Sequence, residues 1–600
     1  MVNFYLNCFI LGDKSCEPIP VKTSPDHKIL ELIQDIIEAY GALVGNIRLV
    51  NVELFKVDLS AEYDDLAGIQ VPSGRLRLIN SVKDYWENLM DLDITRVHVL
   101  VKADVVPVID RAQSQYESQR ESDGPTSPVS SAIKQLSLPA EHDKTAKGFQ
   151  NAPSASDAAV HAEFKEQQNK GDIPIYNGRP LRLTEIPIQL FHPAFDLFEA
   201  KLNVSAGPTA RDYQAVESLL IGSQELYDTD TTRWRVISGL LSAMLGYPID
   251  SINRGETGGV VVFSKKYSIR KAYGVIIEVK NEIGTGSSDP WIQGAQSYSR
   301  YWSQEEMTEL RLATRCPSLI ISIAGPWMCV SGAVYLDHVV VQPLTEYVWM
   351  GVHPQRDNRL VRMTQLFNAV SQTIASLSDY YAPFITKASS LPIDHQRFFP
   401  HINRIAGPNG PLEFTYNHKI GDSKIIRPVF EATAQDGSTV VVKFAQSYNF
   451  KAHKLLAEQA LAPVLLSQNE ERVCGGFFMV VMELSGTSLD NYPELEQSTL
   501  EKVRNDIKKA LEILHKNSLV FGDLRPPNVL ITRTDNGSLR GQLVDFDWCG
   551  IEGKANYPVG MNQGRTLGWA TGVEKGALLS RLHDEYMFEN LFEDCYIFLR

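Results

Sequence analysis

Apolar and polar residues follow three different patterns along the 600-residue chain. In residues 1–107, short stretches of alternating apolar and polar positions surround one stretch, 28–41, in which apolar residues recur every three or four positions. Alternation is typical of half-buried strands, and the longer recurrence is typical of amphipathic helices. Both patterns are lost over 108–172 and return from 173 onward. The patterns therefore predict globular parts on either side of a polar segment.

The first part, 1–107, is predicted to be a small α+β domain. Strands are expected at "NFYLNCFI", "PIPVKT", "IRLVNVELFKVDL" and "RVHVLVKA", and a helix is expected at "KILELIQDIIEAYG", after the second strand. The order strand–strand–helix–strand–strand is that of a β-grasp, ubiquitin-like fold.

Residues 108–172 are rich in Ser, Gln, Ala and Glu and nearly free of aromatic residues. A segment of this composition cannot bury enough apolar surface to offset the entropy of its chain. We therefore expect a disordered linker over 108–172.

The next part, 173–392, mixes helical and strand-like segments, which favours helices packed around a mixed sheet. Its uncharged run 318–336 is long enough to raise the question of a membrane span. Pro326, and the polar Asp337 and His338 directly after the run, argue instead for two buried strands around a Gly-Pro turn. We expect no membrane contact.

Composition narrows the function classes only slightly. Apolar residues make up 44% of the chain and charged residues 22%, as in ordinary soluble proteins. A formal charge of −14 argues against non-specific nucleic-acid binding over the whole surface, so such a contact needs a local basic patch. The seven cysteines lack CxxC spacing, which argues against a zinc module or a disulfide framework. No basic segment precedes the strand-like N-terminus, so no cleavable signal peptide is predicted.

The last part, 393–600, begins with strands and becomes helical, which is the order of the two lobes of a protein kinase. Lys443 lies on a β-branched strand, and Glu458 lies on the helix that follows. Phosphoryl transfer from ATP uses a lysine that holds the α- and β-phosphates and a helix glutamate that orients it. A further buried strand ends at Met482 and Glu483, and we include Glu483 in the expected cofactor-binding set.

The stretch "VFGDLRPPNVLI" supplies the candidate catalytic loop. Asp523 and Asn528 have the D-x4-N spacing of a kinase loop, in which the carboxylate accepts the proton of the incoming hydroxyl and the amide holds Mg²⁺. Asp545, in "GQLVDFDWCG", lies at the position of the DFG aspartate and is the second predicted Mg²⁺ ligand. Pro526 and Pro527 stiffen a loop that must hold these groups in place. ATP and Mg²⁺ are therefore the expected cofactors.

Three features depart from the kinase pattern. Phe521 replaces the usual His or Tyr of the loop, and Asp547 replaces the last glycine of a DFG motif. No G-x-G-x-x-G precedes Lys443; Gly421 is a nearby glycine. These departures leave open a nucleotide-binding scaffold that transfers no phosphate.

A second candidate site lies in "AYGVIIEVKNEIG". Glu278 and Lys280 share one face of this strand, because strand side chains alternate. An acid and a lysine so placed can hold Mg²⁺ and orient a water for attack on a phosphodiester. A solvated strand face is the alternative, but the strand is otherwise apolar, and burying an unused charged pair is costly. A basic cluster lies just upstream: Lys265, Lys266, Arg270 and Lys271.

Two of these parts resemble known domains. The stretches "FGDLRPPNVLI", "VDFDWCG", "AHKLLAEQALAP" and "HDEYMFENLF" resemble fungal-type protein kinase-like domains. The middle strand and the helix "WIQGAQSYSRYW" resemble the PD-(D/E)xK restriction-endonuclease fold. The second resemblance implies a site made of Glu278 and Lys280 as the E-x-K pair, Gln293 or Gln296 as the helix glutamine, and Asp250 or Glu256 as the first-strand acid of the metal site. Gly258 and Gly259 stand where that acid is expected.

The first part, with "IRLVNVELFKVDLS" and "RVHVLVKAD", resembles the ubiquitin-like N-terminal domain of Crinkler proteins, and "SLIISIAGPWMCVSGAVY" resembles the middle module of that family. The resemblance implies three domains joined by the linker: a ubiquitin-like domain (1–107), a restriction-endonuclease-like domain (173–392) and a protein kinase-like domain (393–600). It also implies a secreted effector that acts in a host cell, in the nucleus, with the cytoplasm as the alternative.

The sequence thus predicts an effector that combines a Mg²⁺-dependent nuclease-like domain with an ATP-dependent Ser/Thr protein kinase-like domain. The expected partners are a protein substrate for the kinase-like domain, nucleic acid for the middle domain and a protein for the ubiquitin-like domain. The alternative is a pseudokinase scaffold with a degenerate nuclease domain that acts by binding partners.

Overall fold

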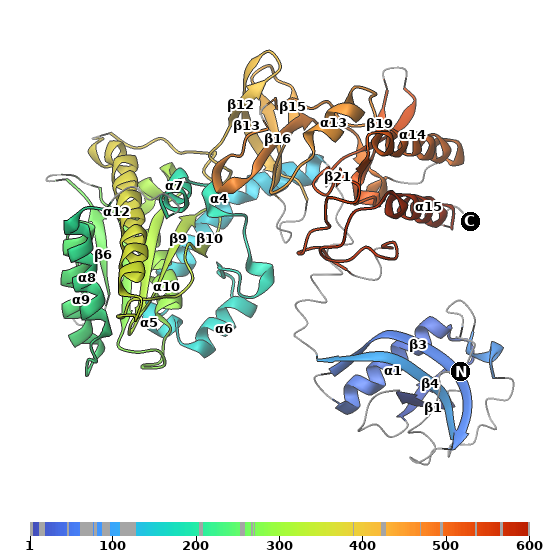
Figure 1. Ribbon diagram of the computed structural model, residues 1–600, viewed down its shortest axis with the longest axis horizontal. Helices are drawn as coiled ribbons and strands as arrows, with labels where there is room; N and C mark the ends of the chain where they lie inside the picture. The colour runs from blue at the N-terminus through green and yellow to red at the C-terminus, as the bar shows by residue number, and fades with distance from the viewer. Residues whose placement is uncertain are drawn as a thin grey trace. The chain divides into compact units, whose positions relative to one another are not determined.

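The structure is a computed structural model of the chain (Figure 1). It describes residues 4–10, 19–44, 47–60, 76, 81–86, 96–107, 128–202, 208–251, 258–265, 268, 270–387, 389–421, 428–468, 470–492, 496–534, 537–563 and 568–597. The chain divides into two compact units, 1–116 and 117–600, and each is described by itself.

The first unit is a four-stranded sheet with one long helix. Its elements are β1 (Phe4–Ile10), β2 (Ile19–Thr23), α1 (Ile29–Val44), β3 (Ile47–Ser60), the short 3-10 helix η1 (Val82–Asp84) and β4 (Arg96–Pro107). The strand order is β2-β1-β4-β3, with β1 and β4 parallel and the outer pairs antiparallel. The predicted order of strands and helix is therefore confirmed.

The core of this unit follows from the apolar pattern. Alternate residues Leu6, Cys8 and Ile10 of β1 are fully buried, and so are Leu32 and Ile36 of α1. These side chains belong to one cluster, because the helical recurrence and the strand alternation each direct one apolar face inward.

Helices occupy most of the segment predicted as a disordered linker. These are α4 (Pro128–Gln150), α5 (Ala155–Ala158) and α6 (His161–Lys170), and 108–127 lie outside the described residues. His142 and Phe149 of α4 are fully buried, and Thr145 Oγ1 donates to the carbonyl of Asp337 at 2.8 Å. The prediction of disorder is therefore wrong for 128–170, because the apolar surface that this segment lacks is supplied by the domain on which it packs.

The middle of the second unit is a seven-stranded mixed sheet with the order β5-β10-β9-β8-β7-β6, and β11 pairs with β9. The strands are β5 (Ile175–Tyr176), β6 (Gly258–Phe263), β7 (Ala272–Lys280), β8 (Ser318–Ala324), β9 (Trp327–Tyr335), β10 (Val339–Pro343) and β11 (Val348–Trp349). β8 and β9 form the predicted hairpin, with Gly325 in the left-handed conformation at the turn. Within the described residues, no helix is long and apolar enough to cross a membrane.

Helices cover both faces of this sheet. They are α7 (Pro193–Leu202), α8 (Ala210–Gln224), α9 (Asp230–Leu245), α10 (Pro290–Ser303), the short α11 (Thr308–Ala313) and α12 (Arg356–Thr386). α10 connects the parallel strands β7 and β8 and packs on the face that carries Glu278, where its Gly294 lies against that side chain. α9 packs on the opposite face, where Trp234 lies against Gly259.

The last part of the unit begins with an antiparallel sheet of order β12-β13-β14-β15-β16. Its elements are β12 (Arg404–Gly407), β13 (Gly410–Lys419), β14 (Val429–Ala434), β15 (Thr439–Ala445), α13 (Phe450–Ala457) and β16 (Phe478–Glu483). Helices α14 (Gln497–Lys516) and α15 (Arg581–Ile597) follow, with the short strands β17 (Thr487–Ser488), β18 (Leu519–Val520), β19 (Val529–Arg533), β20 (Leu539–Leu543) and β21 (Gly550–Ile551). The predicted change from strands to helices is present.

One buried core joins the middle sheet to the five-stranded sheet. Phe399 stacks on Tyr416 with ring centroids 5.7 Å apart, and Tyr416 meets Phe430 edge to face at 5.3 Å. These rings belong to the same cluster as the strands of the middle sheet. The predicted boundary between residues 392 and 393 therefore does not separate two cores.

Candidate active site

Lys443 lies on β15 of the five-stranded sheet, between Val429 of β14 and Val480 of the edge strand β16. Its side chain is mostly buried, and its Nζ atom lies 2.6 Å from Asp545 Oδ1 and 2.7 Å from Asp547 Oδ1. Burial alone would lower the pKa of this amine, but the two carboxylates outweigh burial and raise it. The amine of Lys443 is therefore held as a cation beside Asp545 and Asp547, in the segment that follows β20.

The two carboxylates differ in their surroundings. Asp545 has a positive φ of 71°, a conformation that Asp tolerates better than most residues. Burial raises the pKa of Asp547 to about 7, and the neighbouring Asp545 carboxylate adds to this rise, whereas Lys443 opposes it. Two half-buried acids and one mostly buried lysine thus share a site.

The predicted catalytic loop folds around a bond between its acid and its amide. Asn528 Nδ2 donates to the backbone carbonyl and to Oδ2 of Asp523, both at 2.8 Å. Arg525 pairs with the same carboxylate, with Nη2 at 2.7 Å from Oδ2 and Nε at 2.6 Å from Oδ1. The amide of Val544 donates to the carbonyl of Asn528 at 3.0 Å, which joins the loop to the Asp545 segment. The strand of Lys443, the loop and the Asp545 segment, far apart in the sequence, therefore converge here.

A buried acid of α15, which the sequence reasoning missed, supports this loop. Asp584 is fully buried and accepts hydrogen bonds from the backbone amides of Phe521 and Gly522, both at 2.8 Å, and pairs with His515 Nε2 at 3.0 Å. Gly522 has a φ of 81°, which favours glycine. The signal that could have found Asp584 is its place in "HDEYMFENLF", three and four residues before Met587 and Phe588 and so on the apolar face of the helix, where a charge must be paired to be buried.

Of the two other predicted cofactor-binding residues, Glu458 and Glu483, only Glu458 lies elsewhere than expected. Glu458 is exposed at the C-terminal end of the short helix α13, and the carboxylates paired with Lys443 are those of Asp545 and Asp547. The predicted Lys443–Glu458 pair is therefore wrong, because the helix ends before it can direct this acid inward. Glu483 is exposed at the end of β16, and its amide donates to the carbonyl of Val464 at 3.0 Å.

The predicted phosphate-covering segment lies mostly outside the described residues, which omit 422–427. Gly421, the glycine identified in the sequence, has a φ of 99°.

The second candidate site lies on β7 under α10. Glu278 and Lys280 are both at least nine-tenths buried. Gln293 Nε2 donates to Glu278 Oε2 at 2.9 Å, and Ser297 Oγ donates to Oε1 at 2.6 Å. Gln293 is thus the helix glutamine that meets the acid, whereas Gln296 donates to Gln167 of α6.

The predicted first-strand acid does not complete this site. Asp250 is exposed and joins Val260 of β6 through backbone hydrogen bonds of 2.8 and 2.9 Å. Gly258, not an acid, is opposite Glu278, and a Cβ atom there would lie 2.8 Å from Glu278 Oε2. Glu256 lies outside the described residues, and within them no group of three or more His, Cys, Asp or Glu residues could hold a metal ion. A metal site shared by Asp250 and Glu278 is therefore not formed.

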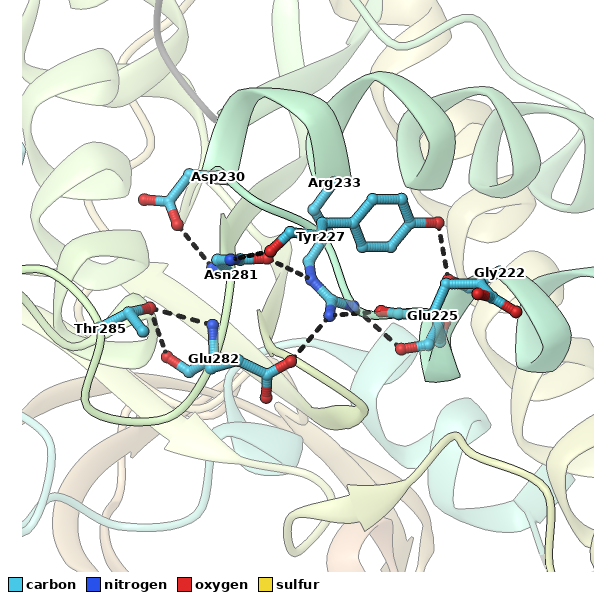
Figure 2. A network of polar contacts seen from close by, with 9 residues as sticks. Gly222, Glu225, Tyr227, Asp230, Arg233, Asn281, Glu282 and Thr285 are labelled. Atoms are coloured by element: carbon cyan, nitrogen blue, oxygen red, sulfur yellow. Dashed lines mark hydrogen bonds and ion pairs between the residues drawn. The ribbon is translucent and has the colours of Figure 1, made fainter.

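A polar network holds the end of β7 (Figure 2). The fully buried Arg233 of α9 donates to Glu282 Oε1 at 3.0 Å and to the carbonyls of Ser223 and Glu225 at 2.9 and 3.0 Å. The amide of Asn281 donates to Asp230 Oδ1 at 2.6 Å. The network fixes the residues that directly follow Lys280, and the sequence reasoning missed it.

Comparison with known proteins identifies one region. No family model matches the chain. A Dictyostelium discoideum protein described as "Probable serine/threonine-protein kinase gdt4" is 32% identical over 112 residues, which are 18% of this chain, and the chain spans only 7% of that relative. Among solved structures, the Cydia pomonella granulovirus kinase PK-1 is 19% identical, with a TM-score of 0.24 over 28% of this chain and 63% of that one. The chain is a multidomain α+β protein that contains a protein kinase-like region, distantly related to known kinases.

Proposed function

We propose that the kinase-like region is an ATP- and Mg²⁺-dependent protein kinase. The observation that carries the proposal is the convergence of Lys443, Asp523, Asn528 and Asp545 through direct contacts between β15, the loop and the segment after β20. These are the groups that phosphoryl transfer to a hydroxyl requires.

The side chains fit the expected cofactors. Carboxylate and amide oxygens are the ligands that Mg²⁺ prefers, and Asp545 and Asn528 supply one of each. The Nδ2 atom of Asn528 is bonded to Asp523, which leaves Oδ1 as the ligand atom. Mg²⁺ bound there would neutralise charge on the transferred phosphate.

Each protein group then has a distinct task. The buried cation Lys443 holds the α- and β-phosphates in place. Asp523 accepts the proton of the acceptor hydroxyl, and Asn528 orients its carboxylate. Asp584 and the two prolines hold the loop backbone, so Asp523 keeps its position when the acceptor arrives.

Transfer of labelled phosphate from ATP by the intact chain tests the proposal. Asp523→Asn is expected to lower the transfer rate about 10²- to 10⁴-fold, the usual contribution of a general base, while the dissociation constant for Mg²⁺–ATP stays within a few-fold. Glu501→Gln, an exposed acid on α14, is the matched control and should transfer normally.

The alternative is a nucleotide-binding scaffold without transfer, and the paired Arg525 is the observation in its favour. Its guanidinium contacts both oxygens of Asp523 and so occupies the carboxylate that has to meet the acceptor hydroxyl. A chain that binds Mg²⁺–ATP and transfers no phosphate, in wild type and in Asp523→Asn alike, would establish this alternative.

For the middle domain we propose a PD-(D/E)xK-like nuclease as a second activity. The support is the buried Glu278 and Lys280 on one face of β7, with Gln293 bonded to the acid and β8 parallel to β7 after the α10 connection. Plasmid cleavage by the intact chain in Mg²⁺ should be lost in Glu278→Gln and kept in Glu305→Gln, an exposed acid. If the wild-type chain does not cleave the plasmid, the nuclease proposal is wrong and the domain is degenerate.

The first unit completes a Crinkler-like arrangement in this proposal. Its strand order, with a parallel central pair, supports a β-grasp domain that binds a protein partner. A secreted effector that acts in the host nucleus is the corresponding role. Microscopy of the tagged chain in host cells tests the location, and exclusion from the nucleus would contradict it.

A further inference from the structure

Lys443 of the proposed kinase site is paired with Asp547, an acid at a position where kinase motifs have glycine. Asp545 is the expected metal ligand, so Mg²⁺ and Lys443 would share the charge of its carboxylate. The other carboxylate in contact with Lys443 Nζ is that of Asp547, at 2.7 Å. A kinase motif has glycine at this position.

The backbone around Asp547 is fastened to the segment just after Lys443. Ser447 Oγ donates to the carbonyl of Asp547 at 2.7 Å. Asn449 donates from its backbone amide to the carbonyl of Phe546 at 3.1 Å and from Nδ2 to the carbonyl of Cys549 at 3.2 Å. Three hydrogen bonds therefore hold the acid at a fixed distance from the strand that carries the lysine.

The helix that would normally supply the acid contributes packing instead. His453 of α13 stacks on Phe546 with ring centroids 4.9 Å apart, and its ring nitrogens contact Tyr448 Oη at 2.8 Å and the carbonyl of Pro463 at 2.9 Å. The acid at the end of this helix, Glu458, is exposed. α13 thus holds the segment that carries Asp547 and gives Lys443 no carboxylate.

We propose that Asp547 is the positioning residue for Lys443, in place of a helix glutamate. The inference rests on the proposed kinase function and concerns the regulation of that site. The expected metal ligand Asp545 and the lysine's partner Asp547 lie two residues apart. The position of this one segment therefore sets both the metal site and the orientation of Lys443. A shift of Glu458 then has no effect on the lysine.

The first test separates the two acids by nucleotide kinetics. Asp547→Asn keeps the shape of the side chain and removes its charge, so the KM for ATP should rise about tenfold or more, as for the loss of a charged hydrogen bond. Asp547→Glu should recover part of the loss, and Glu458→Gln should match wild type. Unfolding curves of each variant show whether the fold is kept.

A second readout needs no activity. Acylation of Lys443 by acetic anhydride, followed by mass spectrometry, reports how much of the amine is uncharged. Asp547→Asn should increase the labelling rate about threefold or more, because a fall of about half a pKa unit already exposes roughly three times as much free amine. Glu458→Gln should leave the rate unchanged.

The outcomes distinguish the inference from the proposed function. If the wild-type chain transfers no phosphate, the proposed kinase function is wrong. The labelling of Lys443 alone then decides whether Asp547 holds this lysine. Normal transfer with the same KM and labelling in Asp547→Asn as in wild type overturns the inference alone. A larger effect of Glu458→Gln than of Asp547→Asn also overturns it.

Discussion

A largely buried histidine between β9 and β10 carries a charge that the fold stabilises. His338 Nδ1 lies 3.0 Å from Asp337 Oδ1, and Nε2 lies 3.3 Å from Glu185 Oε2. The ring of Tyr176 is tilted against the His338 ring, with the centroids 3.8 Å apart. Burial opposes the charge, but the two carboxylates outweigh it and raise the pKa of His338 to about 10. Lys419 of β13 lies 3.4 Å from Glu185 Oε1, so the cluster links the two sheets.

The stability of the second unit should depend on this cluster within a definite pH range. A histidine with a raised pKa stabilises fully below its unfolded value of about 6.5 and loses the effect as pH rises through about 10. Burial opposes the charge of Glu185, but Lys419 and His338 lower its pKa to about 2, so its contribution is lost as pH falls from about 4.5 toward that value.

His338→Gln should therefore lower the unfolding temperature most near pH 6, and the difference from wild type should shrink as pH rises to about 10.5. Thermal unfolding followed by circular dichroism measures it. A difference that is the same at both pH values would mean that the charge of His338 contributes nothing.

At the scale of elements, α15 supports the proposed catalytic loop. Asp584 near its start accepts two backbone hydrogen bonds from residues directly before Asp523. Removing its charge leaves buried donors without a full partner, which costs about 1–3 kcal/mol for each affected group.

Asp584→Asn should therefore lower the free energy of unfolding by about 2–3 kcal/mol and reduce phosphate transfer, since the loop loses its fixed backbone. Glu585→Gln changes the exposed neighbour and should leave both unchanged. Denaturant unfolding and the transfer assay measure the two effects. An Asp584→Asn chain as stable as wild type would show that the loop does not depend on α15.

At the scale of the whole molecule, the second unit has a continuous core. Besides the stacked rings, Gly475 donates its amide to Asp196 Oδ1 at 2.7 Å, and Arg315 Nη2 donates to the carbonyl of Phe399 at 2.9 Å. Segments of the middle domain thus bind the segments that lead into β12 and β16 of the five-stranded sheet. Cutting the chain between them exposes apolar surface on both pieces.

Residues 117–600 produced without the first unit should therefore unfold in one cooperative transition, whereas 393–600 produced alone should be less stable. The loss is about 1.5–3 kcal/mol for each aromatic side chain that becomes fully exposed. Calorimetry of both pieces measures it. Equal unfolding temperatures would show that the shared core adds no stability.

Local pattern was sufficient for the elements and for part of the site. The β-branched run before Lys443 and the apolar run after the loop each specify a strand through their own residues, and the uncharged run 318–336 specifies two strands around its Gly-Pro turn. The spacing of Asp523 and Asn528 places both on one short loop. These features depend on neighbours in the chain.

Contacts between distant segments decided the rest. The partner of Lys443 is Asp547 rather than Glu458, because the length of α13 and its packing on Phe546 decide which acid points inward. Residues 128–170 form helices because the domain on which they pack buries His142 and Phe149. Asp250 stays exposed because its backbone register joins it to Val260, away from Glu278. In each case the free energy comes from burial and pairing between segments far apart in the chain, which no single stretch of sequence contains.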